Sequence, residues 1–153
     1  MLIDPASPGV EAIIEVLRQA GIRTKRQPPV VDLGSVRVVQ LLYGPKGAFM
    51  DVQIDLILAE SVFHREALAR RVPAQLSDAK FDLFMSSCED LLILKMNAGR
   101  IIDRADAASL LRLNRTTLDL PYLLRWVAQL NLHSAWAEIW SEAISEEPLP
   151  ESP

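Results

Sequence analysis

Two aspartates in one alternating stretch are the residues of this sequence best placed to do chemistry. Residues 48–60 read AFMDVQIDLILAE, and a period of two puts Asp51 and Asp55 on one face of a strand and four apolar side chains on the other. Aspartate is disfavoured in strands, so the pair needs an explanation. Either this sheet face is open and solvated, or the strand carries a metal or general-base site. At about 3.3 Å per residue the two Cβ atoms lie roughly 13 Å apart, too far to chelate one cation together.

A lysine in an otherwise apolar helix is the next candidate. Lys95 follows LLIL in the stretch SSCEDLLILKMNAGR, and a buried ammonium needs a partner. Asp103 or Asp106 would supply one as a structural ion pair. Arg100 and Asp103 are three residues apart and form a local ion pair if a helix runs through them.

The sulfur and imidazole groups give weaker signals. Cys88 near a helix start has either a depressed pKa or the inert character of a small buried thiol. His64 and His133 have no metal-ligand spacing to each other or to Cys88, so we expect both histidines to be ordinary.

Turn and cap residues divide the chain into short elements. The first half predicts a helix over 9–20 with Ser7 as its cap and Gly21 at its end, a polar segment over 23–29, and a hairpin of strands 36–43 and 49–58. The second half predicts a short helix over 61–71, a hairpin of 74–76 and 81–85, and a helix over 87–99 with a Ser86–Glu89 capping box. Three more helices follow, from Asp103 or Ala105 to Leu113, after Asp119, and from Ser134.

This order of elements predicts an α+β fold. We expect a small mixed, largely antiparallel sheet flanked by helices, with a helical C-terminal part. Residues 1–147 are predicted to form one domain, of which 1–85 contains the sheet and 86–147 is mainly helical, and the acidic, proline-rich residues 148–153 should be disordered.

Composition limits the partners. A formal charge of −4 argues against general DNA binding, and no apolar run reaches the length of a membrane span. One cysteine excludes an internal disulfide, which fits a reducing cytoplasm. Half the residues are apolar, which favours a full core, an oligomer interface, or both.

Three segments in order resemble the small MNT-like nucleotidyltransferases, relatives of the AbiEii toxins. They are MDVQIDLILAESVFHREALARR, SSCEDLLILKMNAGRIIDRADAASLL and the helical LPYLLRWVAQLNLHSAWAEI, and the resemblance, from Met50 onward, covers about two thirds of the chain. The resemblance implies a nucleotidyltransferase-like fold and Mg²⁺-dependent transfer of a nucleotide from a nucleoside triphosphate to a hydroxyl of a protein, an RNA or a small molecule. It makes Asp55 the third catalytic carboxylate and a metal ligand, and it makes Lys95 and Arg100 contacts to the nucleotide. Asp51, on the same strand, is a further candidate metal ligand.

The sequence departs from that family at its start. Such enzymes open with a Gly-Ser turn and an Asp-x-Asp strand that helps to hold two metal ions, whereas here Met1-Leu2-Ile3 resembles the tail of that strand. We therefore expect the N-terminal part of such an enzyme to be missing from this chain. One carboxylate strand cannot hold two Mg²⁺ ions, so a single weak site is expected.

The sequence is compatible with two functions. One is an impaired Mg²⁺-dependent nucleotidyltransferase. The other is a non-catalytic interaction or regulatory module derived from such an enzyme, in a toxin–antitoxin-like setting. A sheet edge that lacks its usual neighbour recruits another chain, so we also expect a homodimer or larger oligomer.

Overall fold

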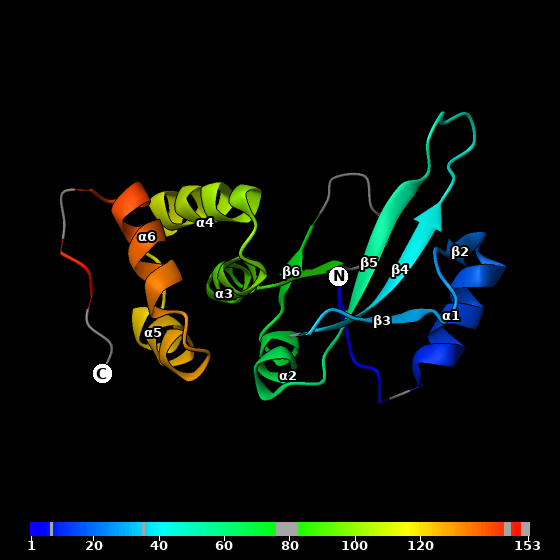
Figure 1. Cartoon of the computed structure of the whole chain (residues 1–153), viewed down its shortest axis with the longest axis horizontal. Coiled ribbons are helices and arrows are strands. Elements are labelled where there is room, and N and C mark those ends of the chain that lie inside the picture. Colours follow the sequence, from blue (N-terminus) through cyan, green and yellow to red (C-terminus); the bar gives the residue numbers. More distant parts are fainter. Residues whose placement is uncertain (7, 35, 76–82, 146–147, 151–153) are drawn as a thin grey trace. The chain divides into compact units, whose positions relative to one another are not determined.

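The computed structural model describes every residue except 7, 35, 76–82, 146–147 and 151–153. The chain divides into two compact units, Met1–Ala69 and Arg70–Pro153. The first unit holds a sheet and two helices, and the second holds a two-stranded ribbon and four helices (Figure 1). The class is α+β with a helical C-terminal part, as the sequence predicts.

A mixed sheet forms the first unit. Its strands are β1 (Leu2–Ile3), β2 (Ile22–Thr24), β3 (Val30–Asp32), β4 (Arg37–Tyr43) and β5 (Val52–Leu58). The order across the sheet is β1-β5-β4-β2, and β3 also pairs with β4. Only β1 runs parallel to its neighbour, with Leu2 opposite Ile57. The predicted hairpin of β4 and β5 is confirmed, with Leu41 opposite Ile54 and Gln40 opposite Asp55.

Helix α1 (Val10–Gln19) covers one face of this sheet. The buried centre of the packing consists of Val39 and Leu41 of β4 and Leu56 and Leu58 of β5, which alternate along their strands as a period of two requires. The apolar residues of α1 that pack against this centre keep helical spacing; they are Val10, Ile13, Ile14 and Leu17. The face that carries Asp55 is the other one.

The limits of the strands differ from those expected. Residues 49–51 precede β5 and do not belong to it, and Phe49 and Met50 at the hairpin tip are exposed. The segment over 23–29, expected to be merely polar, begins inside β2, and β3 follows it. Pairing with the long strand β4 supplies the hydrogen bonds that hold both short strands, a tertiary effect that local composition does not reveal.

The helix ends of the first unit follow local chemistry. Gly21 has a φ of 80° directly after α1, a left-handed conformation that favours glycine. The expected Ser7 cap lies outside the described residues; the helix begins after Gly9 without a side-chain cap. Ser61 begins α2 (Val62–Ala69) by accepting a hydrogen bond at Oγ from the His64 amide.

The second unit begins with the antiparallel ribbon of β6 (Val72–Ala74) and β7 (Leu83–Met85). A second hairpin is present as predicted, but its first strand is 72–74 rather than 74–76, and its second is 83–85 within the predicted 81–85. The predicted turn at 77–80 lies outside the described residues. Helices follow over α3 (Cys88–Ala98), α4 (Ile101–Asn114), α5 (Leu120–Gln129) and α6 (His133–Ala143). Gly99 ends α3 with a φ of 66°, and Asp119 caps α5 by accepting from the Tyr122 amide, both as predicted.

A buried carboxylate ties three parts of this unit together. Asp90, fully buried in α3, accepts hydrogen bonds from the Ser87 hydroxyl and from the Tyr122 hydroxyl of α5, the latter at 2.6 Å. Arg70 lies over the Tyr122 ring and pairs with Asp90 and Glu89. The expected Ser86–Glu89 capping box is therefore wrong: Ser87 is the cap and Asp90 its partner, one residue further on.

Candidate functional site

Asp55 lies in the middle of β5 on the sheet face opposite α1. Its carboxylate is exposed and accepts one side-chain hydrogen bond, from Gln53 Nε2 at 3.0 Å. The amino group of Met1 donates to the Asp55 carbonyl oxygen at 2.7 Å, and burial lowers the pKa of that amino group against the opposing effect of the nearby carboxylate. No cationic side chain among the described residues pairs with Asp55, so this carboxylate is available to a ligand.

Asp51 lies in a different setting. It precedes β5, and its carboxylate forms an ion pair with Arg23, which reaches across from β2. The two aspartates proposed as metal ligands are therefore separated both along the chain and by their partners. The sequence does not predict the ion pair between Arg23 and Asp51, because the two residues are 28 positions apart and come together only when the sheet forms.

Lys95 and Arg100 belong to the second unit, where both bind carboxylates of α4. Lys95 Nζ lies 2.7 Å from Asp106 Oδ2 and 3.4 Å from Asp103 Oδ1, and Arg100 Nε lies 2.5 Å from Asp103 Oδ2. The sequence predicts Asp103 or Asp106 as the partner of Lys95, and in the structure Lys95 pairs with both. A role of Lys95 and Arg100 in holding a nucleotide stays a prediction.

These ion pairs shift the pKa values of their members in the expected directions. The hydrogen bond to Asp106 is the largest cause that raises the pKa of Lys95, and the hydrogen bond from Arg100 is the largest that lowers the pKa of Asp103. Asp103 is buried, whereas Asp106 is exposed. The charge on Asp103 is thus stabilised by its partners despite its burial.

Cys88 illustrates the opposite case. Burial is the largest cause that raises the pKa of its thiol, and the nearby Glu89 acts in the same direction. This direction is opposite to the depressed pKa considered for a thiol at a helix start.

A divalent cation at Asp55 would have few protein ligands. Within the described ranges, no three or more His, Cys, Asp or Glu side chains are arranged to hold a metal ion. One neutral oxygen is nevertheless available on the strand beside Asp55: Gln40 Oε1 is buried without a hydrogen-bond partner, and Gln40 is the residue directly opposite Asp55. A carboxylate and an amide oxygen suit a hard cation that keeps several of its waters. One exposed carboxylate with an amide side chain opposite it supplies fewer protein oxygens than a pair of metal ions requires.

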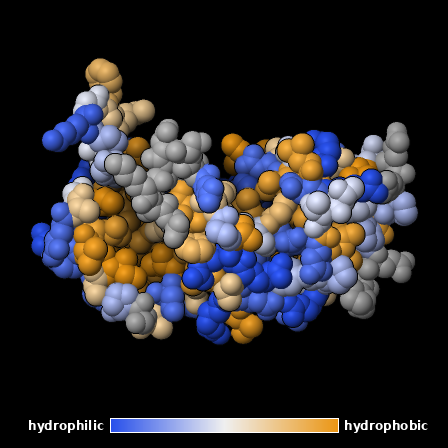
Figure 2. All heavy atoms as spheres, turned by 180° about the vertical axis from the view of Figure 1, so that it is seen from behind, coloured by the Kyte–Doolittle hydropathy of each residue, from blue (hydrophilic) through white to orange (hydrophobic). Residues whose placement is uncertain are grey.

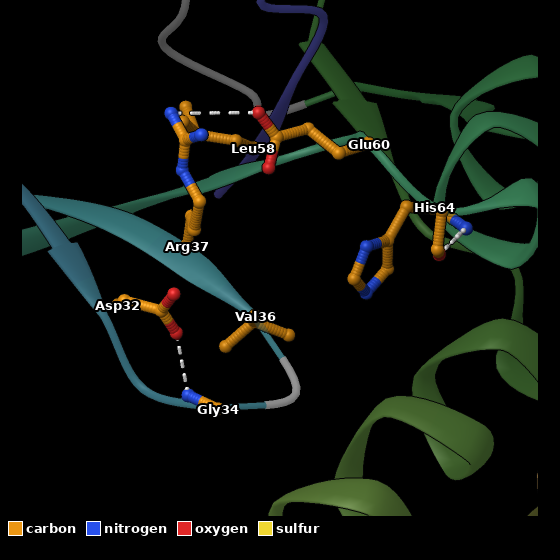
Figure 3. A pocket seen from close by; sticks show the side chains of 8 residues that line it. Asp32, Gly34, Val36, Arg37, Leu58, Glu60 and His64 are labelled. Atoms are coloured by element: carbon orange, nitrogen blue, oxygen red, sulfur yellow. Dashed lines mark hydrogen bonds and ion pairs between the residues drawn. The ribbon is translucent and has the colours of Figure 1, made fainter.

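Sequence reasoning missed a second set of polar residues at the end of β5. Asp32, Arg37, Glu60 and His64 line one pocket of the first unit (Figure 3). They come from two stretches of the chain, the β3–β4 hairpin and the connection from β5 into α2, and His64 was expected to be ordinary. The four-residue spacing of Glu60 and His64 at the start of α2 was the one local signal that could have pointed to the pocket.

Comparison with known protein families, curated proteins and solved structures finds no match for this chain. Within the part of the chain that the structure describes, no helix is both long and apolar enough to cross a membrane.

The Asp103 ion pairs give a test of how the second unit is held together. We expect Asp103→Asn to lower the free energy of unfolding by about 1–3 kcal/mol at pH 7, less than the loss typical of an isolated buried pair because Asp106 still pairs with Lys95. Asp106→Asn, at an exposed position, should cost under about 1 kcal/mol. Urea unfolding followed by tryptophan fluorescence measures both, since all three tryptophans lie in this unit.

The same variants fix the sign of the pH dependence. A carboxylate whose pKa is depressed in the folded state stabilises the protein above its unfolded pKa of about 4 and loses that contribution as pH falls through the folded value. The difference between wild type and Asp103→Asn should therefore be complete at pH 7 and shrink below about pH 4. A difference that stays constant into acid would contradict this account of Asp103.

Proposed function

We propose that this chain is a nucleotidyltransferase-like domain in which Asp55 supplies one carboxylate to a Mg²⁺–nucleoside triphosphate site. The single observation that carries the proposal is the exposed Asp55 carboxylate, unpaired with any described cationic side chain, at mid-strand in β5. Its strand lies between the antiparallel β4 and the parallel β1, and the resemblance of the surrounding residues to such enzymes names the same aspartate.

The ligand set decides what this site does. Mg²⁺ is bound through one or two carboxylates together with waters and phosphate oxygens, and Asp55 with the Gln40 amide oxygen meets the protein's share of one such shell. When bound, the ion would neutralise phosphate charge. Asp51 does not add to it while paired with Arg23. We therefore assign weak nucleotide binding to this chain and no turnover through a pair of metal ions.

Titration of ATP in the presence of Mg²⁺ tests the proposal. Wild type should bind with a Kd of about 100 μM or weaker and form no labelled transfer product, because the site has one carboxylate. Asp55→Asn should abolish this binding and leave the circular dichroism spectrum unchanged, since the side chain is exposed and the substitution keeps its shape.

Asp51→Asn is the matched control. It removes the same charge four residues from Asp55, but from a carboxylate that is already paired with Arg23. Its affinity should stay within about twofold of wild type. An equal loss of ATP affinity in both variants would show that the effect comes from net charge and not from a site at Asp55. Micromolar ATP binding with a labelled transfer product would show that Asp55 belongs to a working catalytic site.

A specific observation also favours an interaction module as the second candidate. The hairpin between β4 and β5 ends in exposed apolar side chains, visible at the end of the projecting hairpin in Figure 2. Phe49 and Met50 are at least four-fifths exposed, and Tyr43 and Val52, which lie opposite each other in the register, continue the apolar surface toward the sheet. Aromatic and methionine side chains are enriched where protein interfaces bury their centre.

Self-association through this hairpin tip is the testable form of the second candidate. Light scattering at micromolar concentration should give at least a dimer mass for wild type, and Phe49→Ser should shift it to the monomer because the tip loses its largest apolar side chain. Leu33→Ser, at another exposed apolar position of the first unit, should leave the dimer intact. A monomeric wild type would contradict the candidate.

A further inference from the structure

A small polar pocket lies at the carboxyl end of β5, away from Asp55. It has a cavity volume of about 180 Å³ and is bordered by the turn between β3 and β4 and by the start of α2 (Figure 3). Its charged and titratable lining residues are Asp32, Arg37, Glu60 and His64. Pockets for drug-sized ligands have about 300–1,000 Å³, so this one would take a molecule of only a few heavy atoms.

The charges of the pocket sum to one negative unit at neutral pH. Asp32 and Glu60 are carboxylates, and Arg37 is the one guanidinium of the lining. The ion pair between Arg37 and Glu60 spans 3.6 Å, longer than a hydrogen bond, so Glu60 retains acceptor capacity. Asp32 accepts the Gly34 amide at one oxygen, at 2.7 Å, which leaves its second oxygen.

His64 adds a neutral acceptor. The residue is only 4% exposed, and its ring points into the pocket toward Val36 (Figure 3). Its backbone amide is held by Ser61 Oγ, while neither ring nitrogen has a hydrogen-bond partner among the described residues. Burial lowers the pKa of the imidazole more than the nearby Glu60 raises it. At pH 7 the ring is therefore uncharged, with one nitrogen that accepts and one that donates.

We propose that this pocket binds a small molecule through an aliphatic primary ammonium group. Such a group carries three donors and one positive charge, and the pocket offers it the Glu60 carboxylate and the His64 ring nitrogen as acceptors, with the Asp32 carboxylate adding negative potential. A phosphate or carboxylate would be repelled by the carboxylates of Asp32 and Glu60, and the only guanidinium among the described lining residues, that of Arg37, is already paired with Glu60. A metal ion fits less well, because the described carboxylates and His64 are not arranged as a chelating group.

Backbone amide chemical shifts during titration with ethanolamine test this site directly. The amides of Gly34, Ser61 and His64 should shift saturably with a Kd of about 1 mM or tighter. Choline, which has the same charge and no N–H donor on its trimethylated nitrogen, should bind at least about tenfold more weakly if the ammonium donates hydrogen bonds as proposed. Inorganic phosphate should not produce saturable shifts at these amides.

Variants separate the pocket from general electrostatics. Glu60→Gln should weaken ethanolamine binding at least about tenfold, whereas Glu11→Gln, the same charge change on the exposed face of α1, should leave it within about twofold. If Glu60→Gln unfolds, Asp32→Asn serves as the second variant, with a weaker but measurable loss expected. Absence of saturable shifts in wild type, equal binding of choline, binding of phosphate instead, or equal loss in Glu11→Gln would each overturn the proposal.

Discussion

The register between β4 and β5 is the constraint on which the first unit depends. It places four buried side chains under α1 and, by the alternation of a strand, turns Asp55 to the opposite face beside Gln40. A slip by one residue would send the apolar set to the open face and Asp55 into the core, where an unpaired carboxylate is costly. The same pairing that stabilises the sheet therefore also creates the one exposed acidic position at mid-strand. At the hairpin tip the chain turns between the two strands with Gly47 at a φ of 82° and a hydrogen bond from the Ala48 amide to the Pro45 carbonyl oxygen.

The second unit depends on polar contacts instead. Asp90 is enclosed within a helix that is apolar on most sides. It is tolerated there because the Ser87 and Tyr122 hydroxyls donate hydrogen bonds to its oxygens and Arg70 lies 3.5 Å away as an ion-pair partner. Asp103 plays a similar part between Lys95 and Arg100. In both clusters a buried carboxylate has partners from a different element, which sets how the helices meet more specifically than apolar contact alone. Charged residues that look like ligand contacts in the sequence are here engaged in holding helices together.

Local signals in the sequence predicted the local features well. Gly99, Asp119 and the turn between β4 and β5 each specify a conformation through their own chemistry, and the structure has all three. The sequence could not supply what depends on distant pairing. Strands β2 and β3 are only three residues long and are held by their pairing with β4, and Arg23 meets Asp51 only through that arrangement. The pocket around His64 brings together two stretches that are distant in the sequence, the β3–β4 hairpin and the connection from β5 into α2, so neither stretch alone predicts the whole pocket.

The proposal that Asp55 holds a divalent cation on the sheet face opposite α1 is open to a direct test. Paramagnetic Mn²⁺, which takes the same oxygen ligands as Mg²⁺, measures this most directly when added at low ratio while backbone amide signals are recorded. The account predicts broadening centred on Asp55 and its cross-strand neighbour Gln40, removed by Asp55→Asn and relieved by excess Mg²⁺. Broadening centred on Asp51 or on Glu60, or none at all, would contradict it.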